Sequence, residues 1–364
     1  MITELAIDNF RGFAKFEVNG VKPVNLIVGR NNGGKTSLLE AIHIGGSRGD
    51  YSAIQAISTR RGEQVSLHTG TNTSQAALDI TCFYHDYKVE QCSAFVIKGD
   101  GDLGTTEVYV REIEPQDFNS SGGHGSVSYG GQSSVEVAGF PTAFVIERHF
   151  NGDHLDDTVV NGGSVFRRGR VRSSVFPFVS ADSLQASQLR SMWDQVLARG
   201  DEQRIYDALR IIQPDVEDVQ FLSSNRTHGG SSTAGIVVRR NGSRSRVPLG
   251  SFGDGMRRLL SLAVVLGSTE VNHCVLIDEI DTGLHHSVLA PMWELIIQTA
   301  LERQVQIFAT THSLDCLKGL AAFCERSSEH ANDVAVHKVD CEISSNILVE
   351  GKLVKDFLGT LDPR

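Results

Sequence analysis

Apolar positions follow two different periods along the chain, and each period indicates a different kind of element. In the first fifty residues, alternation and a short apolar run predict three strands, and a spacing of three to four residues predicts one helix. These elements fall at 3–10, 13–18, 24–28 and 36–44. Alternation returns after residue 76 and predicts five strands, at 77–84, 88–98, 106–113, 134–137 and 142–147. Residues 119–134 are dominated by Gly and Ser and predict a mobile loop.

The second half of the chain alternates between helical and strand patterns. A strand at 174–179 precedes two helices at 182–199 and 202–212, and two strands at 236–240 and 244–249 flank the turn Asn241–Gly242. The remaining predicted elements are a helix, a strand, a helix, a strand and a helix, at 255–266, 274–277, 286–302, 305–310 and 313–323. This alternation predicts an α/β fold with a mostly parallel sheet flanked by helices, and the strands at 77–147 predict an additional antiparallel β-rich lobe.

The composition of the chain excludes several classes of protein. The chain has 364 residues, of which 40% are hydrophobic and 21% charged, as in a globular protein with a sizeable core. No run of about 18 apolar residues occurs, which excludes a membrane span, and the first residues lack the plan of a signal peptide, so we expect a cytoplasmic location. The six cysteines form no CxxC pair, which argues against a zinc site and a disulfide framework. A net charge of −10 restricts any nucleic-acid contact to a local basic patch.

One segment matches a phosphate-binding loop at every position. Residues 29–36 read Gly-Arg-Asn-Asn-Gly-Gly-Lys-Thr and fit G-x-x-x-x-G-K-[ST], between a predicted strand and a predicted helix. Glycines let backbone N–H groups approach phosphate oxygens, Lys35 would reach the β- and γ-phosphates of ATP, and the Thr36 hydroxyl would bind Mg²⁺. The alternative is a glycine-rich turn with a solvated lysine. The candidate nucleotide-binding residues here are Asn31, Asn32, Gly33, Gly34, Lys35, Thr36 and Ser37.

Two later strands end in groups that suit the same chemistry. Asp278 and Glu279 follow the apolar strand 274–277, where Asp278 would bind Mg²⁺ and Glu279 would polarise the water that attacks the γ-phosphate. His312 follows the strand 305–310 and would hydrogen-bond the terminal phosphate. The alternatives are a solvated strand end for the carboxylates and a cap of the following helix for His312.

A third segment carries glycines at the start of a predicted helix. Ser251, Gly253 and Gly255 would form a second anion site there. Two chains arranged head to tail would use both anion sites and enclose two nucleotides. The alternative is an ordinary core helix with an N-cap.

Taken in this order, the motifs resemble the ABC-type ATPase heads of the RecF, SMC and OLD (overcoming lysogenization defect) families. The resemblance covers residues 1–46 and roughly 180–364. It implies that Gly29–Thr36 is an OLD-type Walker A, that Asp278 and Glu279 are Walker B, and that His312 is the switch histidine. It further implies that Asp281 begins the D-loop, that Arg11 lies near the nucleotide, and that 251–255 is the signature motif, although Phe252 and Asp254 interrupt the usual Ser-Gly-Gly run.

The resemblance also sets the expected organisation. We expect one ABC-type ATPase domain over 1–364, with 1–46 and 180–364 as its nucleotide-binding core and 47–179 as the β-rich lobe. The sequence between the two halves carries no sustained heptads, which excludes an SMC-like coiled coil. Residues 347–351 faintly resemble the opening strand of a Toprim nuclease domain, but no DxD motif follows, so we expect a final sheet strand and a short helix instead. Gln185 and Gln188 are uncertain candidates for a Q-loop.

Two arginine clusters are candidates for phosphate contacts with DNA or RNA, and pairing with carboxylates is an equally serious alternative. One lies on the predicted hairpin and the other upstream of it: Arg239, Arg240, Arg244 and Arg246, and Arg167, Arg168, Arg170 and Arg172.

Two hypotheses of function remain open at this point. The first is an ATP-hydrolysing switch that dimerises on ATP, in DNA repair or antiphage defence, with a separately encoded nuclease or toxin as effector. The second is a nucleotide-binding sensor or scaffold that holds a partner protein with little or no hydrolysis. A transporter ATPase is a weaker third option, because the sequence shows neither a clear Q-loop nor an intact signature.

Overall fold

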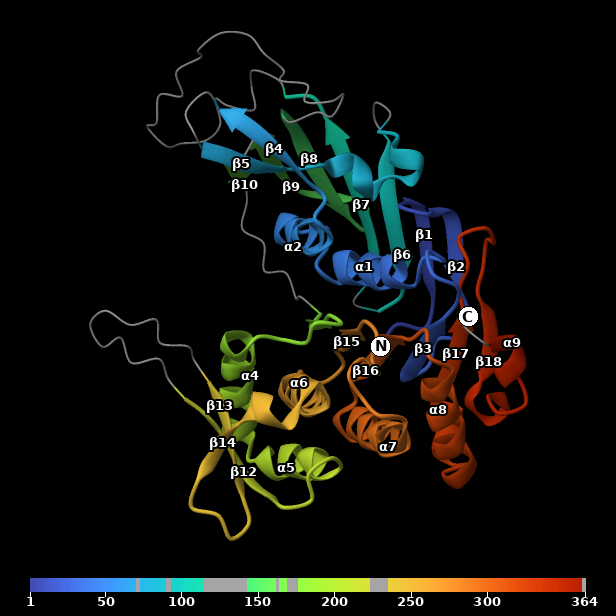
Figure 1. Ribbon diagram of the computed structural model, residues 1–364. Coiled ribbons are helices and arrows are strands. Elements are labelled where there is room, and N and C mark those ends of the chain that lie inside the picture. Colours follow the sequence, from blue (N-terminus) through green and yellow to red (C-terminus); the bar gives the residue numbers. More distant parts are fainter. Residues whose placement is uncertain are drawn as a thin grey trace.

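The computed structural model describes residues 1–69, 73–89, 93–101, 103–113, 143–161, 164–168, 176–222 and 235–361 (Figure 1). The predicted loop at 119–134 and the predicted strand at 134–137 lie outside these residues, as do Arg170 and Arg172 and the side chains of Arg167 and Arg168. In the described part of the chain, no helix is both long enough and apolar enough to cross a membrane.

A mostly parallel sheet of six strands forms one layer, in the order β11-β15-β16-β3-β17-β18. The first five strands are parallel and β18 is antiparallel to β17. The strands are β3 (Val24–Val28), β11 (Phe178–Val179), β15 (Cys274–Ile277), β16 (Gln306–Thr310), β17 (Val334–Lys338) and β18 (Ile347–Glu350). β3, β15 and β16 are buried along their whole length, as the apolar runs predict for strands covered on both faces.

An antiparallel sheet of seven strands forms a second layer, in the order β10-β9-β8-β7-β6-β1-β2. Its strands are β1 (Leu5–Phe10), β2 (Phe13–Val18), β6 (Ala94–Gly99), β7 (Thr105–Arg111), β8 (Ala143–Phe150), β9 (Asp153–Asn161) and β10 (Ser164–Arg168). Two smaller sheets join β4 (Gln64–Thr69) to β5 (Thr73–Leu78) and β12 (Val216–Phe221) to β13 (Ile236–Arg240) and β14 (Arg246–Pro248).

The parallel sheet separates two apolar clusters, one on each of its faces, and helices cover both faces (Figure 1). α1 (Lys35–Gly46) lies between the two large sheets, and its residues Leu38, Leu39 and Ile42 share an apolar cluster with β1, β6 and one face of β3. The opposite face of the parallel sheet packs on α6, α7 and α8. The remaining helices are α2 (Tyr51–Arg61), α4 (Ala186–Arg199), α5 (Glu202–Arg210), α6 (Asp254–Ser268), α7 (His286–Arg303), α8 (Leu314–Arg326) and α9 (Leu358–Leu361), with 3₁₀ helices at Ile80–Phe83, His85–Tyr87, Leu249–Phe252, His330–Asp333 and Gly351–Leu353.

Several expectations need correction. The predicted strand at 77–84 is wrong beyond Leu78, because the Asp79 carboxylate accepts from Thr81 N and starts a 3₁₀ helix. β1 and β2 do not join the parallel sheet; β1 pairs with β6 and β2 in the antiparallel sheet, so the predicted boundary at residue 46 does not separate the two sheets. The pattern analysis missed α2, β4, β9, β10, β12 and β17, and most of β5. The final strand and short helix expected at 347–351 are present as β18 and the 3₁₀ turn Gly351–Leu353.

Candidate nucleotide-binding site

The loop between β3 and α1 requires its glycines. Gly34 has φ +92°, and a Cβ there would lie 2.6 Å from Phe13 Cζ. A Cβ at Gly29 would lie 2.3 Å from the carbonyl oxygen of Val339, and one at Gly33 would lie 3.0 Å from that of Arg30. The backbone of 29–34 therefore packs against β2 and the end of β17 with no room for side chains at these positions.

The start of α1 is arranged to receive an anion. Among the described residues no side chain caps this helix, so the N–H groups of its first turn are left for another acceptor. The Lys35 ammonium lies over the same loop and donates to the carbonyls of Gly29 (2.7 Å) and Arg30 (2.9 Å). Burial lowers the pKa of Lys35, and the nearby carboxylates of Asp278 and Glu279 oppose that shift.

Asp278 lies beside the loop, although 242 residues separate it from Thr36. The Thr36 hydroxyl donates to both carboxylate oxygens of Asp278, at 3.1 and 3.2 Å. A hydroxyl and a carboxylate are the hard oxygen donors that Mg²⁺ prefers, and Mg²⁺ takes its remaining ligands from water and substrate phosphates. This pair fits a magnesium ion bound together with a nucleotide.

Glu279 and His312 face each other across adjacent strand ends. His312 Nδ1 lies 3.6 Å from Glu279 Oε1, and both side chains are about half exposed. The alternative role of His312, a cap of the following helix, belongs to Ser313 instead, because the Ser313 hydroxyl accepts from Cys316 N and caps α8. His312 is therefore placed beside the carboxylate that follows Asp278, at the end of the parallel sheet where ligands bind in such folds.

Two threonines that the sequence analysis did not single out connect these groups. The Thr310 hydroxyl donates to Asp278 Oδ1 (2.6 Å) and accepts from Glu279 N (2.8 Å). The Thr311 hydroxyl donates to Asp281 Oδ1 at 2.6 Å. The two threonine side chains at the end of β16 thus fix the acidic turn 278–281. In the sequence, only their position directly before His312 indicated such a role.

The segment 251–255 lies against Gly283 of its own chain, two residues after the acidic turn. Gly253 has φ +87° and precedes α6, and a Cβ at Gly255 would lie 2.9 Å from the carbonyl of Gly283. Among the described residues, no hydrogen bond or ion pair connects Ser251, Gly253 or Gly255 to residues 29–36. The helix begins at Asp254, one residue earlier than predicted.

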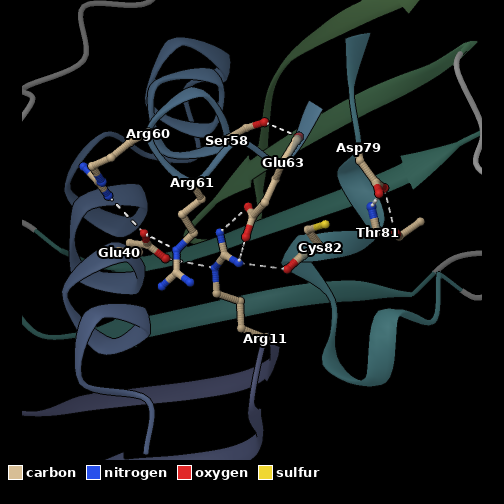
Figure 2. Close-up of polar contacts among 9 residues, drawn as sticks. All are labelled: Arg11, Glu40, Ser58, Arg60, Arg61, Glu63, Asp79, Thr81 and Cys82. Carbon is tan, nitrogen blue, oxygen red and sulfur yellow. Dashed lines mark hydrogen bonds and ion pairs between the residues drawn. The ribbon is translucent and has the colours of Figure 1, made fainter. Parts of the chain in front are cut away.

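The hydrogen bonds and ion pairs of Arg11 in the described part of the chain are with residues outside the phosphate loop, and its place near the nucleotide stays a prediction. Its guanidinium makes two hydrogen bonds of 2.8 Å to the carboxylate of Glu63, and its Nε lies 2.9 Å from Glu40 Oε2 (Figure 2). It also stacks over the Phe83 ring at 4.7 Å. Arg11 has φ +51° at the β1–β2 turn, which directs its side chain toward α1 and α2.

The remaining polar candidates have ordinary partners. Arg239 pairs with Asp218 and Glu217, and Arg240 pairs with Asp215, so half of the arginines on the β13–β14 hairpin are neutralised locally. The Gln188 side chain accepts from Gln185 N at the start of α4. These contacts favour the structural alternatives for both groups.

Comparisons with known proteins bear on this arrangement. A family model described as "AAA domain, putative AbiEii toxin, Type IV TA system" matches residues 24–315, which span the phosphate loop and His312. The chain belongs to this family. As an AAA-domain protein it is similar to an ATP/GTP phosphatase of Helicobacter pylori, with 20% identity over 338 residues and 87% of each chain covered. It is also similar to the DNA replication and repair protein RecF of Nitrosococcus oceani, with 38% identity over 74 residues, 20% of each chain.

Solved SMC heads align with most of this AAA-domain chain. One is an SmcHead bound to the C-winged helix domain of ScpA, with TM-score 0.48, 11% identity and coverage of 98% of this chain and 99% of that chain. Another is the SMC head domain from Thermotoga maritima, with TM-score 0.42, 13% identity and coverage of 96% and 98%. The family match accords with the predicted ATPase head, and the sheet topology confirms the predicted α/β fold, with a mostly parallel sheet and an antiparallel β-rich layer.

Proposed function

We propose that the protein binds ATP with Mg²⁺ at residues 29–37 and hydrolyses it. The observation that carries the proposal is the pairing of Thr36 with both carboxylate oxygens of Asp278, because it brings the two halves of a nucleotide site together from distant parts of the chain. The amide groups at the start of α1 and the Lys35 ammonium would hold the phosphates. Thr36 and Asp278 would hold Mg²⁺, which neutralises charge on the β- and γ-phosphates when bound.

Hydrolysis would then depend on the groups at the two strand ends. Glu279 would accept a proton from the attacking water, and His312 would hydrogen-bond the terminal phosphate and hold the water in line. Their separation of 3.6 Å is short enough for both groups to contact one bound water. The exposure of both side chains supports access of substrate to them.

The signature segment would act on a second chain. Since Ser251, Gly253 and Gly255 make no contact with their own phosphate loop among the described residues, a head-to-tail dimer is the arrangement in which they would meet a nucleotide. ATP would join two heads and hydrolysis would release them. We propose a role of this switch in DNA repair or antiphage defence, with a separately encoded nuclease or toxin as effector and DNA as a second candidate partner.

The test replaces the proposed base without changing its shape. Glu279→Gln should keep ATP binding, lower turnover by about 10²-fold or more and trap an ATP-dependent dimer, because a general base contributes about 10²–10⁴-fold. Turnover is measured as phosphate release and the dimer by light scattering after gel filtration. Glu270→Gln, at a side chain 75% exposed, is the matched control and should behave as the wild type.

Two results would count against the proposal. A Glu279→Gln protein that hydrolyses ATP at the wild-type rate and dimerises no more than the wild type would contradict it. A wild type that binds ATP with Mg²⁺ but shows no turnover would favour the sensor or scaffold instead.

A further inference from the structure

A buried arginine on α6, Arg258, contacts the backbone of the acidic turn. The guanidinium of Arg258 donates to four backbone carbonyls, those of Ser180 (2.5 Å), Asp278 (2.7 Å), Glu279 (2.8 Å) and Ile280 (3.4 Å). Three of these carbonyls belong to consecutive residues of the turn that carries Asp278 and Glu279. The fourth lies at the end of β11, so the same side chain also joins the turn to the edge of the parallel sheet.

The turn itself has a backbone that needs such support. Glu279 has φ +49°, in the left-handed region, which a non-glycine residue adopts only at an energetic cost. Its N–H donates to the Thr310 hydroxyl, and its carbonyl accepts from Arg258 and from Thr282 N (3.0 Å). These bonds hold both peptide groups of Glu279 and so fix the direction of its side chain.

Burial of the charged Arg258 side chain costs solvation free energy, which a residue with only a packing role would not require. It is 1% exposed, and among the described residues it forms no ion pair within 4.0 Å. Desolvation lowers the pKa of Arg258 to about 10, and the charges of Asp278, Asp281 and Glu279 oppose that shift. A guanidinium has five donors in a planar fork, which suits several convergent carbonyls better than an ammonium does.

We infer that Arg258 is a positioning residue that holds the carboxylates of Asp278 and Glu279 in their working directions through the carbonyls of the turn. This inference rests on the proposed function, because it assigns Arg258 to the same magnesium and water sites. Arg258 also lies four residues after Asp254, in the first turns of the helix that begins at the signature segment. A shift of α6 would therefore move the acidic turn with it.

The experiment compares two equally buried arginines. Arg258→Lys keeps the positive charge and removes the fork, and Arg148→Lys does the same at β8, where Arg148 is also 1% exposed and pairs with Asp156. For each variant we measure the melting temperature, the affinity for ATP with Mg²⁺ and with EDTA, and the turnover. The ratio of the two affinities is the Mg²⁺ enhancement, and it reports on Asp278 without requiring hydrolysis.

Both variants should melt at lower temperature. Arg258→Lys should keep the affinity for ATP in EDTA, lose about 5-fold or more of the Mg²⁺ enhancement and lose about 10-fold or more in turnover. Arg148→Lys should keep the wild-type enhancement and turnover. An Arg258→Lys protein that melts early but keeps both quantities at wild-type level would overturn the inference.

A second variant covers the case in which the lysine protein does not fold. Arg258→Met removes the buried charge and keeps the packing of the stem, and replacement of buried ions by apolar residues is often tolerated. It should show the same losses, and wild-type values would overturn the inference. Wild-type protein that binds ATP with Mg²⁺ but shows no turnover would contradict the proposed hydrolysis. The Mg²⁺ enhancement of the Arg258 variants would then still test the inference. Wild type without Mg²⁺-dependent ATP binding would overturn both.

Discussion

At the scale of single residues, His337 shows how a buried polar side chain fixes its own protonation. The ring is fully buried on β17, with Nε2 3.0 Å from Asn25 Oδ1 and Nδ1 2.8 Å from Asn346 Nδ2. An amide oxygen accepts and an amide nitrogen donates, so this pairing suits a neutral ring with its proton on Nε2. Burial lowers the pKa of His337 to about 4.

This shift predicts a pH dependence of stability. The unfolded chain binds a proton at this histidine below about pH 6.5, while the folded chain binds it only below about pH 4, so the free energy of unfolding falls as the pH drops between these values. In His337→Gln, the free energy of unfolding should fall less steeply between pH 6.5 and 5. The slope should be smaller than that of the wild type by about 1 kcal/mol per pH unit. Urea unfolding at several pH values measures this. His43, with its pKa lowered to about 4 by burial, keeps its own share of the slope in the variant. An identical slope in variant and wild type would refute the assignment.

The residues of the site differ in how far the sequence could predict them. Lys35, Thr36 and Asp278 were predictable, because each belongs to a short motif whose residue types the chemistry requires, and the structure brings Thr36 and Asp278 into contact. Arg258 and Thr310 were not, because their partners are backbone groups and carboxylates of other segments that meet only in the fold. The partners of Arg11 were not predictable either, because Glu40 and Glu63 are connected to it by no local pattern.

At the scale of elements, a group of buried charges joins α1 to α2 (Figure 2). Glu40, which is fully buried on α1, lies 2.8–3.0 Å from the guanidinium groups of Arg11, Arg60 and Arg61. Arg11 also pairs with Glu63, just after α2, and so extends this group of charges. Since α1 begins at the phosphate loop, these charges connect the loop helix to the antiparallel sheet and α2.

Removal of the central carboxylate should therefore destabilise the fold. Glu40→Gln leaves three guanidinium groups around a neutral amide and should lower the free energy of unfolding by about 3 kcal/mol, as when one partner of a buried ion pair is lost. Glu63→Gln is the matched control and should cost less, because Glu63 is more exposed and, within the described ranges, forms an ion pair only with Arg11. Chemical denaturation measures both. A Glu40→Gln protein within about 0.5 kcal/mol of the wild type would show that the group contributes little.

Elements with strong periodicity were predictable to within a few residues. β2, β3 and β15 have the predicted bounds, and α1 and α7 extend the predicted helices by one or two residues at their ends. The missed helix α2 carries Gln55, Ser58 and Thr59 among few apolar residues, and its apolar face is correspondingly weak. Its N-cap is Asp50, whose carboxylate accepts from Ser52 N.

At the scale of the whole molecule, the arrangement of the sheets followed from the sequence only in part. The alternation of helices and strands predicted the parallel sheet, and β3, β15 and β16 lie in it as expected. The membership of β1 in the antiparallel sheet was not predictable, because it depends on pairing with β6, about ninety residues later in the chain. Thus α1 has a sheet on each side, and the phosphate loop at its start lies where the two layers meet (Figure 1).

The most direct test of this account is a calorimetric titration of ATP, with and without Mg²⁺, into the wild type, Lys35→Ala and Asp278→Asn. The account predicts Mg²⁺-dependent binding by the wild type and no measurable binding by Lys35→Ala, because this variant lacks the ammonium proposed to hold the phosphates. It predicts that Asp278→Asn binds ATP in EDTA as the wild type does but loses about 10-fold or more of the Mg²⁺ enhancement. Wild-type affinity in Lys35→Ala, or a full Mg²⁺ enhancement in Asp278→Asn, would contradict it.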